Sequence, residues 1–146
     1  MKRLWMLAAV VVAFSAGFLV RGAWPGETAV HAQGAGRIFE LRTYTAVDAE
    51  KLTALHARFK NHTLKLFEKH GMQNGMYWVP TDEKLRENTL IYVVSHESQE
   101  AADKSWKAFQ ADPDWIAARN ASEKDGKIVE RLEKVFMTAT EFSPKK

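Results

Sequence analysis

The hydrophobic pattern of the chain changes abruptly after its first twenty residues. A basic Met1-Lys2-Arg3 precedes Leu4–Val20, a stretch of apolar or small residues without a charge. Further on, Val30-His31-Ala32 places small residues three and one positions before Gln33. A basic start, an apolar middle and a small-x-small end are typical of a secretory signal. We therefore predict a signal peptide over residues 1–32 that is removed on export.

A retained membrane anchor is the alternative for the same segment. Residues 4–20 reach only the lower limit of the roughly 17–25 residues that span a bilayer. With either outcome the rest of the chain lies outside the cytoplasm, periplasmic or secreted. A membrane is then a partner only through an uncleaved N-terminal segment. After a linker at residues 33–36, we expect one domain over residues 37–144.

Four segments of this domain have the composition and alternation of β-strands. The first is Ile38–Tyr44 and the second is Met72–Val79. Thr89–Val94 is the strongest of the four, and the last lies within Ile128–Phe142, most clearly at Val135–Thr140. The second and third strands are separated only by a polar connection of hairpin length.

Helical regions separate the other strands. Between Asp48 and His70, apolar residues recur at three- and four-residue steps, which predicts one long helix, and Gly71 is suited to end it. Ser98 caps a second helix, and Asp112-Pro113 supplies an N-cap and a first-turn proline for a third, short one. The apolar stripe of the long helix consists of Leu52, Leu55, His56, Phe59, Thr63, Leu66, Phe67 and His70.

The order of these elements, β-α-β-β-α-β, predicts an α+β, ferredoxin-like fold with a four-stranded antiparallel sheet. Right-handed crossovers place both helical regions on one face of that sheet. Within the strand 89–94, Leu90, Tyr92 and Val94 point one way and Ile91 and Val93 the other, so both faces of the sheet are apolar. Since the helices cover only one face, we predict that a second copy covers the other. The result is a homodimeric α/β barrel around a cavity.

The first strand carries a polar row that bears on this cavity. Phe39 and Leu41 are expected to meet the helices, which leaves Glu40, Arg42 and Tyr44 on the enclosed side. A buried charge without a partner is costly. Either Glu40 and Arg42 neutralise each other or a partner-chain residue and hold the interface in register, or the row orients a ligand in a mostly apolar cavity.

Charge and composition narrow the partners. The 146-residue chain has a net charge of +3. Removal of residues 1–32 takes away three basic residues and one acidic residue, which leaves 18 basic and 17 acidic residues and a net charge of +1. No cluster of Lys or Arg forms a stripe that would neutralise several phosphates, so nucleic acid is not an expected partner. The chain has no cysteine, which excludes disulfides, thiolate catalysis and cysteine-bound metal.

The histidines give no metal motif. None lies three or four residues from another, and no H-E-x-x-H pattern occurs. Structural or capping roles are favoured for His56, His62 and His70, and the sequence does not assign them further. His96 ends the strand 89–94 on the side of Tyr92, near a barrel mouth. It is a candidate general base or haem ligand, with an ordinary surface histidine as the alternative.

Several short motifs together resemble the NIPSNAP family over residues 37–144. The carriers are Glu40-Leu41-Arg42-Thr43-Tyr44, Phe59 with His62, Lys69-His70-Gly71, Asp112-Pro113-Asp114-Trp115 and Phe142-Ser143-Pro144. The resemblance implies a dimeric α/β barrel. The wider superfamily includes cofactor-independent monooxygenases, haem-degrading enzymes, haem peroxidases and lactone isomerases.

The family resemblance supplies no catalytic set. The NIPSNAP branch has no settled reaction, so no residue role carries over to this chain. Its animal members are linked to mitochondria and vesicle traffic, and the export signal predicted here departs from them. That cellular role is therefore not transferred.

Three functional hypotheses follow, and the sequence does not decide whether the protein is an enzyme. The first is an exported binding protein for a small apolar or aromatic ligand, without a cofactor. The second is a cofactor-independent monooxygenase or isomerase in which Arg42 stabilises an enolate or phenolate and His96 moves a proton, with haem binding as a variant. The third is an interaction module without a ligand. The proposed ligand-binding residues of the first hypothesis are Glu40, Arg42 and Tyr44, which orient the ligand, and Trp78, Tyr92 and His96, which wall the cavity.

Overall fold

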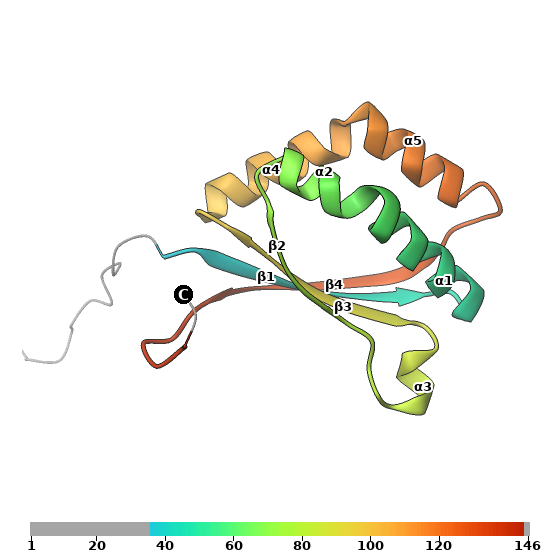
Figure 1. Cartoon of the computed structure of the whole chain (residues 1–146), viewed down its shortest axis with the longest axis horizontal. Helices are drawn as coiled ribbons and strands as arrows, with labels where there is room; N and C mark the ends of the chain where they lie inside the picture. Colours follow the sequence, from blue (N-terminus) through green and yellow to red (C-terminus); the bar gives the residue numbers. More distant parts are fainter. Residues whose placement is uncertain (1–35, 145–146) are drawn as a thin grey trace, which may run out of the picture. The chain divides into compact units, whose positions relative to one another are not determined.

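The computed structural model describes residues 36–144, which form an antiparallel sheet with helices packed on one face (Figure 1). The four strands are β1 Ile38–Ala46, β2 Gln73–Trp78, β3 Thr89–His96 and β4 Val129–Thr138, in the spatial order β2-β3-β1-β4. This is the predicted ferredoxin-like α+β arrangement, and it is confirmed. The predicted signal peptide and almost all of the linker lie outside the described residues.

The helices follow the predicted order with two additions. The first helical region is α1 Ala49–Arg58, the π-helix η1 Phe59–Thr63 and α2 Leu64–Lys69. The second is α4 Gln99–Ala111 followed by α5 Pro113–Ser122, and a short α3, Glu83–Arg86, lies in the connection between β2 and β3. No helix between residues 36 and 144 is both long and apolar enough to cross a membrane.

The caps explain where the first helical region begins and ends. The Asp48 carboxylate accepts a hydrogen bond of 2.7 Å from the Lys51 backbone N–H, which satisfies one of the free donors of the first turn. At the other end Gly71 has a φ of +77°, a left-handed conformation that glycine adopts without a steric penalty. The predicted bounds of this region are therefore correct.

Its middle is not a regular α-helix. The backbone N–H of Leu64 donates to the Phe59 carbonyl five residues earlier, and the Thr63 hydroxyl donates to the Arg58 carbonyl at 3.2 Å. The result is the wider turn of η1, in place of the continuous α-helix that the periodicity predicts. Such π turns occur frequently at functional sites.

Strand register shows which face of the sheet each residue occupies. Glu40 lies opposite Val94 and Arg42 opposite Tyr92, so these four side chains share one face. Tyr92 and Val94 are fully buried, and Figure 1 shows the long helices over a single face of the sheet. Glu40, Arg42 and Tyr44 therefore point toward the helices.

This placement corrects the predicted orientation of β1. Phe39 and Leu41, expected beneath the helices, lie on the opposite face. Hydrophobicity alone predicts the reverse orientation of β1, because an acid and a guanidinium are less suited to a core than two apolar side chains. The core accepts them because Trp106 and His96 provide polar partners on the helix side.

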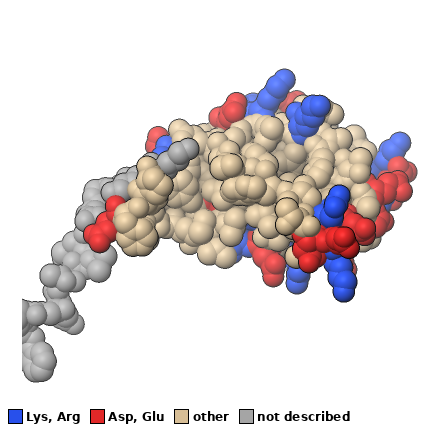
Figure 2. All heavy atoms as spheres, turned by 60° about the horizontal axis from the view of Figure 1, so that its bottom comes forward, with Lys and Arg blue, Asp and Glu red and all other residues tan. Residues whose placement is uncertain are grey.

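The face of the sheet away from the helices is largely apolar, and we call it the open face. Figure 2, which turns the underside of Figure 1 forward, shows a broad surface with few charges and a cluster of charges toward one end. Val135 is 56% exposed and Trp78 41% exposed. The apolar side chains that strand register places on the open face are Phe39, Leu41, Trp78, Ile91, Val93, Val135 and Met137.

Candidate functional site

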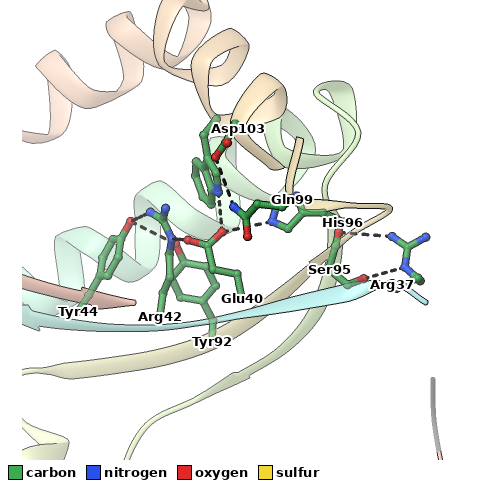
Figure 3. A network of polar contacts seen from close by, with 10 residues as sticks. Arg37, Glu40, Arg42, Tyr44, Tyr92, Ser95, His96, Gln99 and Asp103 are labelled. Carbon is green, nitrogen blue, oxygen red and sulfur yellow. Dashed lines mark hydrogen bonds and ion pairs between the residues drawn. The ribbon is translucent and has the colours of Figure 1, made fainter. Parts of the chain in front are cut away.

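A buried ion pair lies at the centre of the helix-facing side of the sheet. The Arg42 Nε donates to Glu40 Oε1 at 2.8 Å, and both side chains are almost completely withdrawn from water. Figure 3 shows these side chains projecting from β1 toward the helices. The pair is the neutralisation that the sequence offered as one of two interpretations, formed within one chain.

The second carboxylate oxygen of Glu40 has two further partners. The Trp106 Nε1 donates to Oε2 at 2.5 Å, and the His96 Nε2 lies 3.2 Å from the same oxygen. Burial alone would raise the pKa of Glu40. The hydrogen bond with His96, the charge of Arg42 and the hydrogen bonds from Trp106 and Arg42 outweigh burial and leave this pKa below its usual value. Glu40 is therefore an ionised carboxylate in the core.

Arg42 extends the network toward two phenols. Its guanidinium lies 3.5 Å from the centroid of the Trp106 ring, and its Nη1 donates to the Tyr44 hydroxyl at 3.3 Å. The Tyr92 hydroxyl donates to the same Tyr44 oxygen at 3.1 Å. Burial raises the pKa of Tyr92 well above its usual value, so Tyr92 stays a neutral phenol.

Five of the six predicted ligand-binding residues thus belong to one connected cluster, the core network, defined here as Glu40, Arg42, Tyr44, Tyr92 and His96 with Trp106. Sequence reasoning missed Trp106, which is buried on α4 together with Ala102 and Phe109. The sixth predicted residue, Trp78, is separate. Trp78 lies on β2, opposite Ile91 of β3.

His96 is fully buried and does not lie at an exposed mouth of the sheet. Its ring packs near Trp106 and Phe136, with ring centroids 6.3 and 6.4 Å away. Nε2 is engaged by Glu40, and Nδ1 is buried without a hydrogen-bond partner. An axial haem ligand needs a free nitrogen facing room for a macrocycle, so the residues around His96 do not fit haem.

A pocket of about 300 Å³ lies beside the core network, between the first helical region and the end of β2. We call it the β2 pocket. Its volume is at the small end of the range for ligand sites, about 300–1,000 Å³. Its lining is mainly apolar and aromatic, with one histidine and one lysine. The lining residues are His56, Phe59, Lys60, Leu64, Tyr77, Trp78, Val79 and Leu90.

The β2 pocket and the core network share an aromatic wall. The Tyr77 ring stacks on Tyr92 with centroids 5.3 Å apart and an angle of 12° between the rings. Phe59, from the π-helix η1, makes edge contacts with both rings at 5.9 and 5.2 Å. The Tyr77 hydroxyl donates to Asn74 Oδ1 at 2.6 Å, which fixes the ring from the strand side. The aromatic wall is therefore fixed by ring packing from the helical region and by a hydrogen bond from the strand.

A second, more polar groove of about 520 Å³ runs between the first helical region and α5. Asn61, His62 and Lys65 line one side and the small residues of α5 the other. His62 is exposed, and the groove contains no side chain of the core network.

The other histidines have separate environments. His70 Nε2 lies 2.7 Å from Asp112 Oδ2, and Lys69 Nζ lies 2.8 Å from the same oxygen, so His70 joins the end of α2 to the start of α5. His56 borders the β2 pocket, and its Nε2 is buried without a hydrogen-bond partner. Within residues 36–144, no three His, Cys, Asp or Glu side chains come together to hold a metal ion.

Comparison with known proteins agrees with this geometry. The fold is similar to a NIPSNAP family protein of unknown function from Agrobacterium tumefaciens, with a TM-score of 0.66, 18% identity, and coverage of 80% of this chain and 100% of that one. It is also similar to a monooxygenase of Streptomyces coelicolor in complex with nanaomycin D (TM-score 0.54, 16% identity, 77% and 95% coverage). A third similar structure is a cofactor-independent oxygenase from Streptomyces nogalater (TM-score 0.50, 14% identity, 76% and 100% coverage).

At these identities the structural matches define the class of fold, the ferredoxin-like unit found in dimeric α/β-barrel monooxygenases. The NIPSNAP family model matches residues 39–144, nearly the whole described domain. The chain belongs to the NIPSNAP family. A search among curated proteins finds no match.

Proposed function

We propose that this NIPSNAP domain binds a small apolar or aromatic molecule in the β2 pocket. The observation that carries the proposal is a pocket with aromatic and aliphatic walls and only two basic side chains, His56 and Lys60, at its border. Ligand sites in proteins combine mostly apolar walls with a few placed polar groups in this way. The pocket is complete within one chain, so the proposal does not depend on the barrel cavity expected from the sequence.

The core network supports this site from behind. Its hydrogen-bonding groups are directed at one another, so Glu40, Arg42 and Tyr44 have little left to offer a ligand. We propose that they position Tyr92, on which the pocket residue Tyr77 stacks. They are positioning residues rather than groups that touch the ligand.

A thermal-shift screen of small aromatic compounds, both neutral and anionic, with the purified protein tests this function. Binding raises the melting temperature, because a ligand that binds only the folded state stabilises it. Leu64→Trp, which fills the β2 pocket, is expected to abolish the shift. The matched variant Ala121→Phe fills the other groove and is expected to preserve it. The proposal is overturned if no compound binds, or if Ala121→Phe rather than Leu64→Trp removes binding.

A cofactor-independent oxygenase is the second candidate. A buried guanidinium beside two phenols and an indole is the observation that favours it, since a fixed cation in a dry site stabilises a developing phenolate. In this hypothesis Arg42 stabilises the phenolate and His96 moves a proton. Oxygen uptake above the protein-free rate with a quinol, and its loss in Arg42→Met, would support it. No uptake with any ligand found in the screen would exclude it.

We further propose that the protein is a homodimer joined through its open faces. In a single chain the apolar side chains of this face are partly exposed to water. A second copy of the chain is the partner that we expect to cover them. Without any small ligand, a third function remains, an interaction module that uses the same face.

Export of the domain is also a proposal. It rests on the basic, apolar and small-x-small pattern of residues 1–32. A mature protein whose N-terminus is Gln33 would support cleavage. A full-length protein retained in the membrane fraction would instead support an anchor at residues 4–20, and a full-length protein in the cytoplasm would contradict both.

A further inference from the structure

The lining of the β2 pocket indicates which chemical class of ligand it takes. We propose that the ligand is a small amphipathic monoanion, an aromatic or short aliphatic carboxylate. Its apolar body would lie against Tyr77, Trp78 and Leu90, and its carboxylate would lie between His56 and Lys60. This inference rests on the proposed function and names the ligand of the same site.

His56 supplies the first half of the headgroup site. Its Nε2 is out of contact with water and has no hydrogen-bond partner among the described residues. Buried side-chain nitrogens in folded proteins are nearly always hydrogen-bonded. Since the residue also borders the pocket, a turn of the His56 ring would bring this nitrogen to an acceptor group on a ligand.

Lys60 supplies the charge. It is exposed, borders the same pocket and forms no ion pair with any residue between 36 and 144. Lys60 follows His56 by four residues along the same helical region, so the two side chains project from one side of it. A free ammonium and an imidazole with an unsatisfied nitrogen thus border the same apolar pocket.

No acidic side chain is among the residues that line the pocket. The charge of one acid, Glu68, acts on the lining residue Tyr77. Its carboxylate accepts a hydrogen bond of 2.9 Å from the side-chain nitrogen of Asn74, which is not a lining residue. The balance of charge at the pocket therefore favours an anion over a cation.

The same features limit the ligand to a carboxylate on a small body. One lysine and one histidine are a weak set of donors for a phosphate dianion, which proteins usually hold with several donors or a helix N-terminus. His56 and Lys60 lie in the middle of a continuous helical region, where backbone N–H groups are already used. A volume of about 300 Å³ suits one or two rings or a short chain.

Isothermal titration calorimetry with indole-3-acetate and its neutral analogue indole-3-acetamide tests the inference. The acid is expected to bind about tenfold or more tightly than the amide, because hydrogen bonds to charged groups are the stronger ones. Lys60→Gln should remove most of this preference by weakening the binding of the acid. His56→Phe should weaken acid binding, and His56→Gln, which keeps a donor, should restore part of it.

Lys65→Gln is the matched control, since Lys65 lies on the same helical region but lines the other groove. It is expected to bind both probes as the native protein does. Equal binding of acid and amide, or an effect of Lys65→Gln as large as that of Lys60→Gln, overturns the anionic headgroup while the proposed pocket stands. Probe binding that persists undiminished in Leu64→Trp overturns the pocket itself.

Discussion

Glu40 is the residue on which the polar interior depends. It accepts hydrogen bonds from Arg42 and Trp106 and lies within hydrogen-bonding distance of His96, and its side chain is fully buried. Removing the charge of one partner from a buried ion pair leaves the other uncompensated. The stability of the sheet and helix layers therefore depends on this carboxylate far more than on any surface ion pair.

Glu40→Gln is expected to lower the free energy of unfolding by about 3–5 kcal/mol, because the Arg42 guanidinium then stays buried without a counter-charge. Urea unfolding followed by circular dichroism measures the change. Glu133→Gln is the control, since the exposed pair Arg131–Glu133 has a separation of 3.9 Å and is expected to contribute at most about 1 kcal/mol. Similar losses in both variants would contradict the role given to Glu40.

Acid is expected to destabilise the domain through Glu40 and Asp112. The pKa of Glu40 is lowered in the folded state, and hydrogen bonds from Lys69 and His70 lower that of Asp112. A lowered carboxylate pKa gives stability that is fully present above the unfolded-state pKa of about 4 and is lost as pH falls through the folded-state value. When the urea midpoint is measured at a series of pH values from 7 to 2, it should decrease once the pH is below about 4.

Variants of the two carboxylates identify their share of this acid sensitivity. Glu40→Gln and Asp112→Asn should each flatten the fall in the urea midpoint, since an amide does not titrate. A midpoint that rises as pH falls, or an unchanged slope in both variants, would show that neither carboxylate controls acid unfolding.

At this scale the sequence predicted the members of the cluster better than its orientation. The alternation in β1 correctly placed Glu40, Arg42 and Tyr44 on one side, and the pairing of Glu40 with Arg42 was one of the two interpretations offered. The predicted face of the sheet was wrong. The true orientation depends on Trp106, a residue distant in sequence whose indole donates a hydrogen bond to Glu40 and so stabilises the acid under the helices. Such a contact between distant elements leaves no local pattern.

Strand β2 is the element that shapes the proposed pocket. Its pairing with β3 is irregular between Asn74 and Tyr77, so a bulge separates its two paired parts. Gly75 lies in that bulge, and a Cβ built on it would lie only 2.6 Å from the Val93 carbonyl oxygen. Because the backbone fixes the position of a Cβ and the carbonyl oxygen is itself a backbone atom, a side chain at this position would push the edge strand away from the sheet.

Gly75→Ala is therefore expected to destabilise the domain by about 1–3 kcal/mol and to weaken ligand binding, because Tyr77 and Trp78 shift with the strand. Urea unfolding and calorimetric titration of the same protein measure the two effects. The control is Met76→Ala, the next residue, whose side chain is 59% exposed and should matter little to stability. Unchanged stability in Gly75→Ala would show that the bulge is not constrained.

The π-helix η1 shows what periodicity cannot reveal. Apolar steps of three and four residues predicted the extent of the helical region well. A single wide turn hardly changes those steps, so Phe59–Thr63 looked regular. The turn is recognisable only from two hydrogen bonds. The Leu64 backbone N–H donates to the Phe59 carbonyl, and the Thr63 hydroxyl donates to the Arg58 carbonyl. The residues that it presents to the pocket, Phe59 and Lys60, were accordingly not among the predicted site residues.

At the scale of the whole molecule, the open face is the surface on which we expect a second copy to pack. Strand register places Leu41 on this face, flanked by Val93 on β3 and Val135 on β4. Apolar patches of this kind on one sheet face usually mark an interaction surface. The sequence predicted that the face exists from the two-sided apolar pattern of β3, and the dimer through it stays a prediction.

Leu41→Glu is expected to convert a dimer into a monomer at micromolar concentration, because it would place two carboxylates in an apolar interface. Light scattering coupled to size-exclusion chromatography gives the mass directly. Ile116→Glu, on α5, is a control of similar chemistry, since Ile116 is 38% exposed in the helix layer on the other side of the sheet and should not affect the mass. A native protein that is monomeric at this concentration would contradict the pairing.

The ligand site predicted from the sequence and the β2 pocket differ in the number of copies of the chain that form them. The sequence suggested a cavity enclosed by two copies, whereas the β2 pocket is formed by one helical region and two strands of the same chain. Trp78 is the one predicted wall that borders it. The remaining lining comes from residues whose apolar spacing indicated only core packing, because a shallow pocket and a filled core have the same periodicity.

The most direct test of the account is a two-dimensional ¹H–¹⁵N NMR titration of the purified protein with indole-3-acetate. We predict that the largest shift changes occur at the amides of residues 56–64 and 77–79, around the β2 pocket, while residues 117–121 of α5 remain unaffected. Shift changes confined to α5 or to the open face, with none around the β2 pocket, would contradict the account.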